Sequence, residues 1–346
     1  MQISRILRAS IGMVLIVSAL IAGSASGARP VDPGYKTYFD GSTTDVTTTP
    51  LGGALLAGGG TDSDVGMKWL LGQGGARGVG KYGDVVVLRT SGSNGYNKWL
   101  VGFGANSVTS IVISSVAGAN SPVVAAAIAK AEIVFIAGGD QATYVRLWSN
   151  TALQTAVNQR INAGYPVGGT SAGLAVIGNY VFAALNGTAY SSTVLANPYD
   201  ATVSLGPALF SVPPILTNVL TDSHFAVRDR MGRLVTFLAR LQQDGTASAP
   251  RGIGIDEASA VGITQAGTGT VFGTGNGAYL LSVTAVITRT CSSGIPLIYT
   301  PVSVQRVPVG QQFAVNSWSN ITPGAASAYT LDAANRVLSS RSGSVY

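Results

Sequence analysis

Short apolar runs alternate with glycine-rich turns along most of the chain. Apolar runs occupy 51–57, 84–88, 108–114 and 133–137, the last three rich in β-branched residues, and helical patterns occupy 122–130 and 142–163. Strands that are apolar on both faces and separated by helices are typical of parallel sheets that helices cover on both sides. The pattern predicts an α/β fold of three layers around a mostly parallel sheet, with ligands bound at the carboxyl ends of the strands.

The pattern changes from about residue 261 onward, where strands and turns follow one another without long helical stretches. Apolar runs at 269–273, 279–286, 296–301 and 302–309 are separated by glycine, proline and serine. This texture is typical of antiparallel strands. We therefore expect a polar lead at 29–50, an α/β catalytic domain at 51–260 and a β-rich C-terminal extension at 261–346, packed on the same domain.

The first 28 residues have the pattern of a secretory signal peptide. Arg5 and Arg8 precede an uncharged apolar run at 11–23, and small residues follow at 24–28. The apolar run is short for a membrane span, and small residues suit a cleavage site, whose position the sequence leaves open. We expect a protein secreted to the periplasm or the medium, without stable membrane association after cleavage. The alternative is an uncleaved N-terminal anchor.

Composition and charge exclude several classes of function. Of 346 residues, 46% are hydrophobic and only 10% are charged, so the chain is not a disordered tail. It has one histidine and one cysteine, which excludes an intrachain disulfide and a zinc site built from several such ligands. The net charge is +6, but the basic residues are spread out without a dense run. We therefore expect no nucleic-acid partner.

A candidate nucleophile lies in the sequence Gly-Thr-Ser-Ala-Gly at 169–173. A short strand precedes Ser171 and an apolar helix pattern follows it, as in the sharp strand-to-helix turns that expose a catalytic serine. Small neighbours are needed because larger side chains would clash in such a turn. The pattern alone is weak in a chain with 45 glycines, and a glycine-rich turn without function is the alternative.

His224 is the candidate general base because the chain has no other imidazole. It follows Asp222 and precedes a basic segment with Arg228, Arg230 and Arg233, whose guanidinium groups suit carboxylates. Alternatively, these arginines form a solvated helix face. Glu257, one of two glutamates, ends a short strand pattern and could orient the histidine. A turn with solvated acids is the other interpretation.

Four motifs together resemble the cyanophycinase family of serine peptidases. They occur in the order of that family, at 137–141 (AGGDQ), 168–173 (GGTSAG), 222–234 (DSHFAVRDRMGRL) and 252–260 (GIGIDEASA). A looser likeness extends from 55–62 to 269–280. One departure is Ser223, which stands where cytoplasmic members often have glutamine, and this puts one substrate contact in doubt.

The resemblance implies a class I glutamine-amidotransferase-like fold and a catalytic triad of Ser171, His224 and Glu257. It also implies hydrolysis of cyanophycin, a poly-aspartate that carries arginine on its β-carboxyl groups, into β-aspartyl-arginine dipeptides. Because the signal pattern precedes it, the chain is most similar to the extracellular members. An aspartyl-peptide peptidase of the same fold and a non-catalytic binding protein are the alternatives.

Further roles follow from that implied mechanism. The backbone N–H of Ala172 and one from the Gly138–Gly139 pair, assigned to Gly139, would hold the oxyanion. No metal or organic cofactor is expected, and the oligomeric state, a homodimer included, is left open. The residues expected to bind substrate are Arg228, Arg230 and Arg233 for carboxylates and Gln141 and Asp222 for amide or guanidinium groups.

Overall fold

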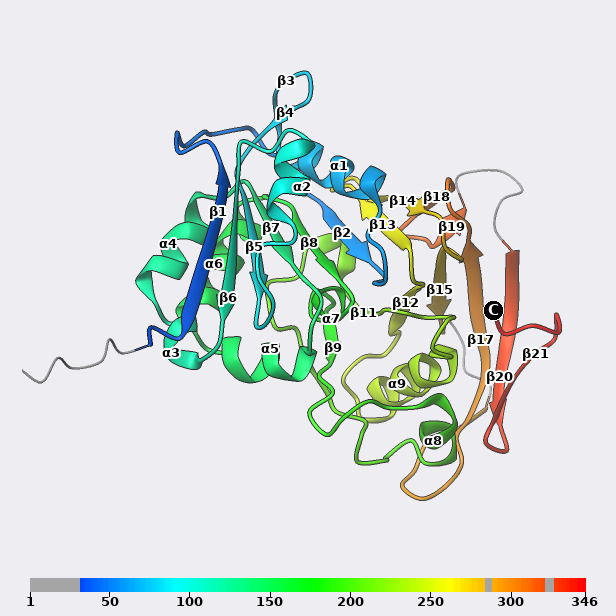
Figure 1. Ribbon diagram of the computed structural model, residues 1–346. Helices are drawn as coiled ribbons and strands as arrows, with labels where there is room; N and C mark the ends of the chain where they lie inside the picture. The colour runs from blue at the N-terminus through cyan, green and yellow to red at the C-terminus, as the bar shows by residue number, and fades with distance from the viewer. Residues whose placement is uncertain (1–31, 284–287, 321–326) are drawn as a thin grey trace, which may run out of the picture. The chain divides into compact units, whose positions relative to one another are not determined.

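The computed structural model describes residues 32–283, 288–320 and 327–346, which form two large β-sheets and the helices around them (Figure 1). Residues 33–346 form one compact unit. The expected signal peptide at 1–28 lies outside the described residues and stays a prediction.

The first sheet has parallel strands at its centre and antiparallel strands on both sides. β6, β5, β7, β8 and β2 are parallel neighbours, whereas β1 pairs antiparallel with β6, and β13 pairs antiparallel with β2. The sheet is therefore mixed, and not mostly parallel as expected. In spatial order its strands are β1 (Tyr35–Gly41), β6 (Ser107–Ile113), β5 (Val85–Arg89), β7 (Ile133–Ile136), β8 (Val167–Thr170), β2 (Ala54–Ala57), β13 (Ser259–Ile263), β14 (Thr268–Gly273), β18 (Gln312–Ala314) and β19 (Ser319–Asn320).

A second sheet, which the apolar pattern did not predict, begins in the region that follows β8. Only β9, β11 and β12 are parallel in it, and the later strands are antiparallel. In spatial order its strands are β10 (Leu205–Pro207), β9 (Tyr180–Phe182), β11 (Val219–Asp222), β12 (Arg251–Ile255), β15 (Ala278–Ser282), β17 (Ile298–Val307), β20 (Ser327–Ala334) and β21 (Val337–Ser340), with β16 (Thr288–Thr290) also paired to β17. The C-terminal strands thus extend both sheets.

The helices cover the two faces of the parallel strands. Val86 and Leu88 of β5 pack in one apolar cluster with α4, α5 and α6, whereas Val85 and Val87 pack with α1 and α2 on the other face. This alternation explains why the strand is apolar throughout. The helices are α1 (Asp64–Gln73), α2 (Asn97–Gly102), α3 (Val116–Ala119), α4 (Pro122–Lys130), α5 (Gln141–Trp148), α6 (Ala152–Asn162), α7 (Ala172–Ala175), α8 (Ser191–Ala196) and α9 (Met231–Gln243); η1 (Pro214–Leu216) is a 3₁₀ turn and β3 (Ala76–Gly78) and β4 (Lys81–Tyr82) form a hairpin.

One helix expected over 142–163 is two helices, α5 and α6. The chain turns at Asn150, whose φ of 59° lies in the left-handed region that a helix cannot continue through. The next residue, Thr151, starts α6, because its hydroxyl accepts a hydrogen bond from the backbone N–H of Gln154. Asparagine tolerates the left-handed conformation and threonine is a good N-cap, so the break follows local chemistry.

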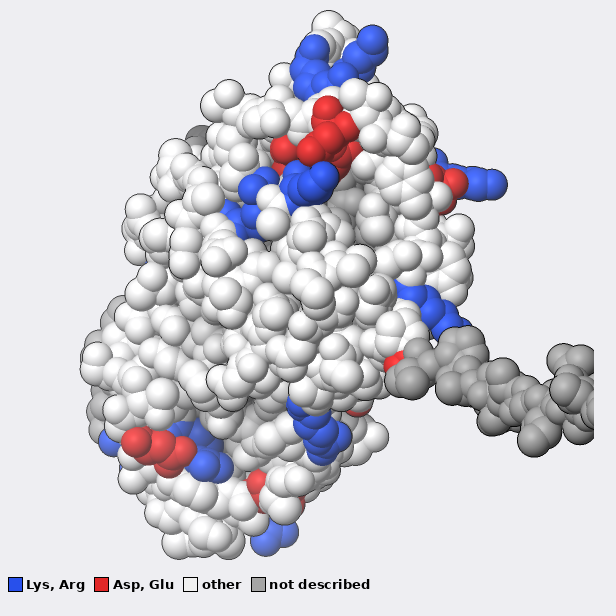
Figure 2. Space-filling model, turned by 90° about the vertical axis from the view of Figure 1, so that its left-hand side faces the viewer, with Lys and Arg blue, Asp and Glu red and all other residues white. Residues whose placement is uncertain are grey.

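Charged side chains on the face seen in Figure 2 stand in small groups separated by broad uncharged areas. Several of the basic groups lie beside acidic ones, which limits the extent of any single-sign surface on that face. Among the described residues, no helix combines the length and apolar character that a membrane span requires.

Candidate active site

Ser171 occupies the sharp turn between β8 and α7. Its φ of 55° and ψ of −117° are uncommon for a residue with a side chain and are typical of strained functional positions. Its backbone N–H donates to the carbonyl of Ala57 at 3.0 Å. The turn is also close to β7, because a Cβ on Gly173 would lie 2.0 Å from the carbonyl oxygen of Ile136. Only glycine allows α7 to start here.

The structure brings Ser171, His224 and Glu257 into one chain of hydrogen bonds. Ser171 Oγ lies 2.7 Å from His224 Nε2, and His224 Nδ1 lies 2.6 Å from Glu257 Oε1. Ser171 follows a strand of the first sheet, whereas His224 and Glu257 lie beyond β11 and β12 of the second sheet. The three side chains therefore meet where loops of the two sheets come together. Proton transfer from a serine to an imidazole requires this order of contacts.

The loop that carries the histidine is held from inside by a buried carboxylate. Asp256 is fully buried, and its Oδ1 accepts hydrogen bonds from the backbone N–H groups of Ala226 and Val227 at 2.9 and 3.0 Å. The backbone N–H of His224 itself donates to the carbonyl of Gly58 at 2.8 Å. Asp256 and Glu257 are adjacent in the sequence but have different contacts. Glu257 contacts the imidazole of His224, whereas Asp256 contacts the backbone of the loop that follows it.

Burial and nearby cations control the protonation of His224. Burial lowers the pKa of His224 below its ordinary value of 6.5, and the charges of Arg228 and Arg230 lower it further, whereas Glu257 acts in the opposite direction. Arg228 lies close enough to lower the pKa of His224, because its Nε is 3.3 Å from Glu257 Oε1, the atom that also contacts the imidazole. The imidazole is thus neutral at pH 7, which is the form that can accept a proton from Ser171.

Two backbone segments near Ser171 are the candidates for an oxyanion hole. Ala172 is the first residue of α7, so its N–H has no acceptor within the helix. Gly138 lies against the serine, since a Cβ on it would be 3.4 Å from Ser171 Cβ. Gly139 follows it and faces Tyr144, whose hydroxyl donates to the carbonyl of Ala137 at 2.9 Å. The expected donors Ala172 and Gly139 thus belong to the two segments that flank the nucleophile.

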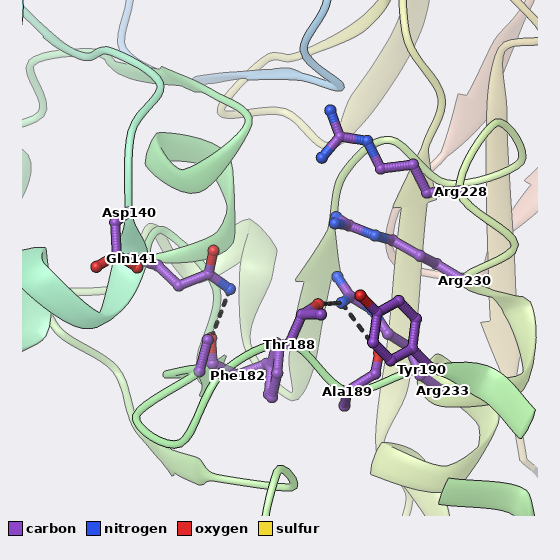
Figure 3. A pocket seen from close by; sticks show the side chains of 11 residues that line it. Asp140, Gln141, Phe182, Thr188, Ala189, Tyr190, Arg228, Arg230 and Arg233 are labelled. Carbon is purple, nitrogen blue, oxygen red and sulfur yellow. Dashed lines mark hydrogen bonds between the residues drawn. The ribbon is translucent and has the colours of Figure 1, made fainter. Parts of the chain in front are cut away.

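A cavity of about 320 Å³ is lined by Arg228, Arg230 and Arg233 (Figure 3). Arg228 links this cavity to the Ser171–His224–Glu257 group, because its Nε lies 3.3 Å from Glu257 Oε1. Gln141 of α5 lies across from these arginines, and its Nε2 donates to the carbonyl of Phe182 at 3.0 Å. Four of the five residues expected to bind substrate therefore line one cavity. Residues of the 182–190 segment, which include Thr188 and Tyr190, also line the cavity, and no sequence motif pointed to them.

Asp222, the fifth expected substrate contact, does not line this cavity. Its side chain is buried, and Arg233 donates to both of its oxygens, from Nε at 2.7 Å and from Nη2. Arg230 Nη1 lies 3.6 Å away, and it also donates to the carbonyl of Ser223 at 2.8 Å. A substrate contact by Asp222 does not fit this burial. Nor do the arginines form a solvated helix face, because α9 begins only at Met231 and Arg233 is 2% exposed.

A further carboxylate, which the sequence analysis missed, supports the strand that ends at the serine. Asp62 accepts hydrogen bonds from Thr170 Oγ1 at 2.7 Å and from Tyr96 Oη at 2.6 Å. Burial raises the pKa of Asp62, and both hydrogen bonds act against that rise. The hydrogen bond from Thr170 thus ties the residue before Ser171 to the loop that follows β2. Its only sequence signal is an acid after a glycine-rich turn.

Comparison with known proteins shows what the chain is similar to. Residues 102–268 match the family described as Peptidase family S51, and this segment contains Ser171, His224 and Glu257. The matched segment is just under half of the chain, which thus resembles peptidase family S51. The resemblance to cyanophycinases is confirmed as well, because curated cyanophycinases match parts of the chain.

Those relatives come from several organisms and match only in part. The cyanophycinase of Geminocystis herdmanii is 35% identical over 37% of this chain and 41% of its own length. That of Trichormus variabilis is 35% identical over 36% of each chain, and that of Synechococcus elongatus is 28% identical over 50% of this chain and 49% of its own. The matches thus span less than half of each relative. A solved peptidase from an acI-B1 Actinobacterium is 15% identical, with a TM-score of 0.46 over 78% of this chain and 98% of its own.

The contacts of the arginines predict that Arg233 and Arg228 respond differently to the same substitution. Arg233→Gln leaves Asp222 as a buried charge without its main partner, which should lower the free energy of unfolding by about 3–5 kcal/mol. Arg228→Gln removes a half-exposed side chain and should change that free energy by no more than about 0.5 kcal/mol. Denaturant unfolding at pH 7 measures both. Equal stability of the two variants would contradict the structural role of the Asp222–Arg233 pair.

Proposed function

We propose that this protein is an exported serine peptidase that hydrolyses cyanophycin to β-aspartyl-arginine dipeptides. The observation that carries the proposal is the unbroken hydrogen-bond chain from Ser171 through His224 to Glu257 beside a cavity lined by three arginines. The match of residues 102–268 to peptidase family S51 and the partial matches to cyanophycinases support a peptidase with this type of substrate. We also propose that its fold is of the class I glutamine-amidotransferase-like type, as the sequence motifs imply.

In the proposed mechanism, Ser171 Oγ attacks a main-chain carbonyl carbon of the substrate. His224 Nε2 takes the serine proton and delivers it to the leaving amine, which leaves an acyl group on Ser171. A water molecule then attacks the acyl carbon while His224 takes one of its protons; the bond between that carbon and Ser171 Oγ breaks, His224 returns the proton to Oγ, and the product leaves with a new carboxylate. Glu257 holds the proton on Nδ1 and so fixes the tautomer in which Nε2 is the acceptor.

The developing oxyanion is held by the backbone N–H groups of Ala172 and Gly139 in this proposal. One such donor contributes roughly 3 kcal/mol to the stability of the transition state in related reactions. The sharp turn at Ser171 supports this role, because the N–H of the residue after the nucleophile is an oxyanion donor in turns of this type.

The cavity supports a substrate with carboxylates and hydrogen-bonding side chains. Arg228 and Arg230 present guanidinium groups toward it, and burial lowers the pKa of Arg230 to about 10, so the Arg230 side chain is charged at pH 7. These groups suit the carboxylates of the arginines that cyanophycin carries on its aspartate side chains. Gln141 keeps its amide oxygen available for a guanidinium or amide of the substrate, because only its nitrogen is engaged.

Export is proposed from the sequence pattern of residues 1–28, in which two arginines precede an apolar run and small residues. An exported enzyme of this kind would act on polymer that has left the cell that made it.

Incubation with cyanophycin granules tests the substrate. We expect soluble β-aspartyl-arginine dipeptide in the supernatant, detected by mass spectrometry, and a loss of at least ~10⁴-fold in kcat for Ser171→Ala. The serine is partly exposed and packs little, so the variant should stay folded. Release of dipeptide from aspartyl peptides but not from granules would favour the alternative peptidase. No hydrolysis of either substrate by the wild-type protein would leave a non-catalytic binding protein.

The lowered pKa of His224 predicts the acid limb of the rate profile. Because neutral His224 is the active form, kcat/KM should be constant near pH 7 and fall through a single protonation with its midpoint below 6.5. The same shift means that the unfolded chain binds this proton more readily than the folded one. The contribution of His224 to stability therefore decreases as pH falls through 6.5. A midpoint above 6.5, or a rate that is unchanged from about pH 4 to 8, would contradict the assignment.

A further inference from the structure

We propose that Tyr346 is a positioning residue for the reaction, because its side chain holds both ends of the loop that carries His224. We call residues 224–230 the histidine loop. This inference deepens the proposed function and rests on it for its effect on catalysis, but its effect on the loop is measurable without any substrate.

The hydroxyl of Tyr346 holds the distal end of the histidine loop. It accepts a hydrogen bond from the backbone N–H of Met231 at 2.9 Å and lies 2.9 Å from Asp229 Oδ1, to which it donates. Met231 is the first residue of α9, and the N-cap residue Arg230 makes no side-chain capping bond. Tyr346 thus supplies from 115 residues away the acceptor that an N-cap side chain usually provides.

The ring of Tyr346 reaches the proximal end of the same loop. It packs edge-on against Phe225, with 6.1 Å between the ring centroids and 79° between the planes, and against Tyr279 at 5.8 Å and 90°. Phe225 is fully buried and directly follows His224. Tyr279 belongs to β15 of the second sheet. Edge-to-face geometry of this kind is favourable for aromatic pairs.

The histidine loop needs such support because its backbone is strained. His224 and Asp229 both have φ of 48°, a conformation that is unfavourable for a residue with a side chain and persists only where the surroundings impose it. Asp256 supports the loop from inside through Ala226 and Val227. Tyr346 supports the residues that Asp256 does not reach, namely Phe225 and Asp229.

The groups around His224 determine what loosening of the loop would do. Ser171 and Glu257 contact the ring, the backbone of Gly59 lies against it, and Arg228 and Arg230 are the nearby cations. Tyr346 itself faces Asp229, with Asp222 farther away. Since burial is the main cause of the low pKa of His224, a looser loop should let this pKa rise toward 6.5.

Proton NMR of the single imidazole tests the proposal directly, because the chain contains one histidine. We expect the titration midpoint of His224 to rise by about half a pH unit in Tyr346→Ala and by less in Tyr346→Phe, which keeps the ring but loses the hydroxyl. Tyr299→Phe is the matched control. Tyr299 is buried in β17 of the second sheet, and its hydroxyl donates to Gln242 Oε1 near the C-terminal end of α9, away from the histidine loop. Its midpoint should equal that of the wild type.

Activity gives the second readout. In Tyr346→Ala, kcat should fall about tenfold on a small serine-reactive ester as well as on peptide, since both reactions use His224. A lower melting temperature with an unchanged His224 midpoint and unchanged kcat would make Tyr346 merely structural and overturn the proposal. If Tyr346→Ala does not fold, Tyr346→Phe decides between the same outcomes. A wild-type protein without any hydrolase activity would refute the proposed function, whereas the NMR midpoints would still test the positioning of the loop.

Discussion

The site depends on the close approach of three loops to the imidazole of His224. The loop after β2 passes so near that a Cβ on Gly59 would lie 2.4 Å from the Cε1 atom of His224. Ser171 approaches the ring from the end of β8, and Glu257 approaches it from the end of β12. Because these strands belong to two sheets, the hydrogen bond from the His224 backbone to Gly58 also ties one sheet to the other. The same contacts therefore fix both the relative position of the two sheets and the geometry of the site.

Buried carboxylates maintain this arrangement. A buried charge without partners is costly, and the two aspartates near the ends of β11 and β12 both have them. Asp222 pairs with Arg233 and so fixes α9 to the end of β11, while Asp256 accepts from the loop backbone and from Asn276 Nδ2 at 2.6 Å. Within the described parts of the chain, neither carboxylate forms a hydrogen bond with the side chain of Ser171, His224 or Glu257. Their effect on chemistry is to keep the histidine loop in a backbone conformation that it would not adopt alone.

Much of the first sheet could be predicted from the sequence, since its central strands are uninterrupted apolar runs and its helices have local start signals. Helix α4 has the expected bounds because Ser121 caps it and Pro122 begins it. The second sheet was missed because β9 and β11 have only three and four residues, separated by long loops. Strands this short leave no periodic pattern, and their pairing depends on contacts distant in sequence.

The candidate site shows the same division. Rare residue types and local turn chemistry identified Ser171, His224 and Glu257, and the structure brings them together. Burial is not visible in a sequence motif, so Asp222 was assigned to the substrate although it pairs with Arg233. Tyr346 lies outside every motif, and only the folded chain brings it to the histidine loop.

Peptide mapping after reaction with a fluorophosphonate tests whether Ser171 is a nucleophile activated by His224, as proposed. We expect a single covalent adduct, on the peptide that contains Ser171, formed at a rate that falls in acid with the titration midpoint of His224. Labelling of another serine, or no adduct on folded protein at pH 7, would contradict it.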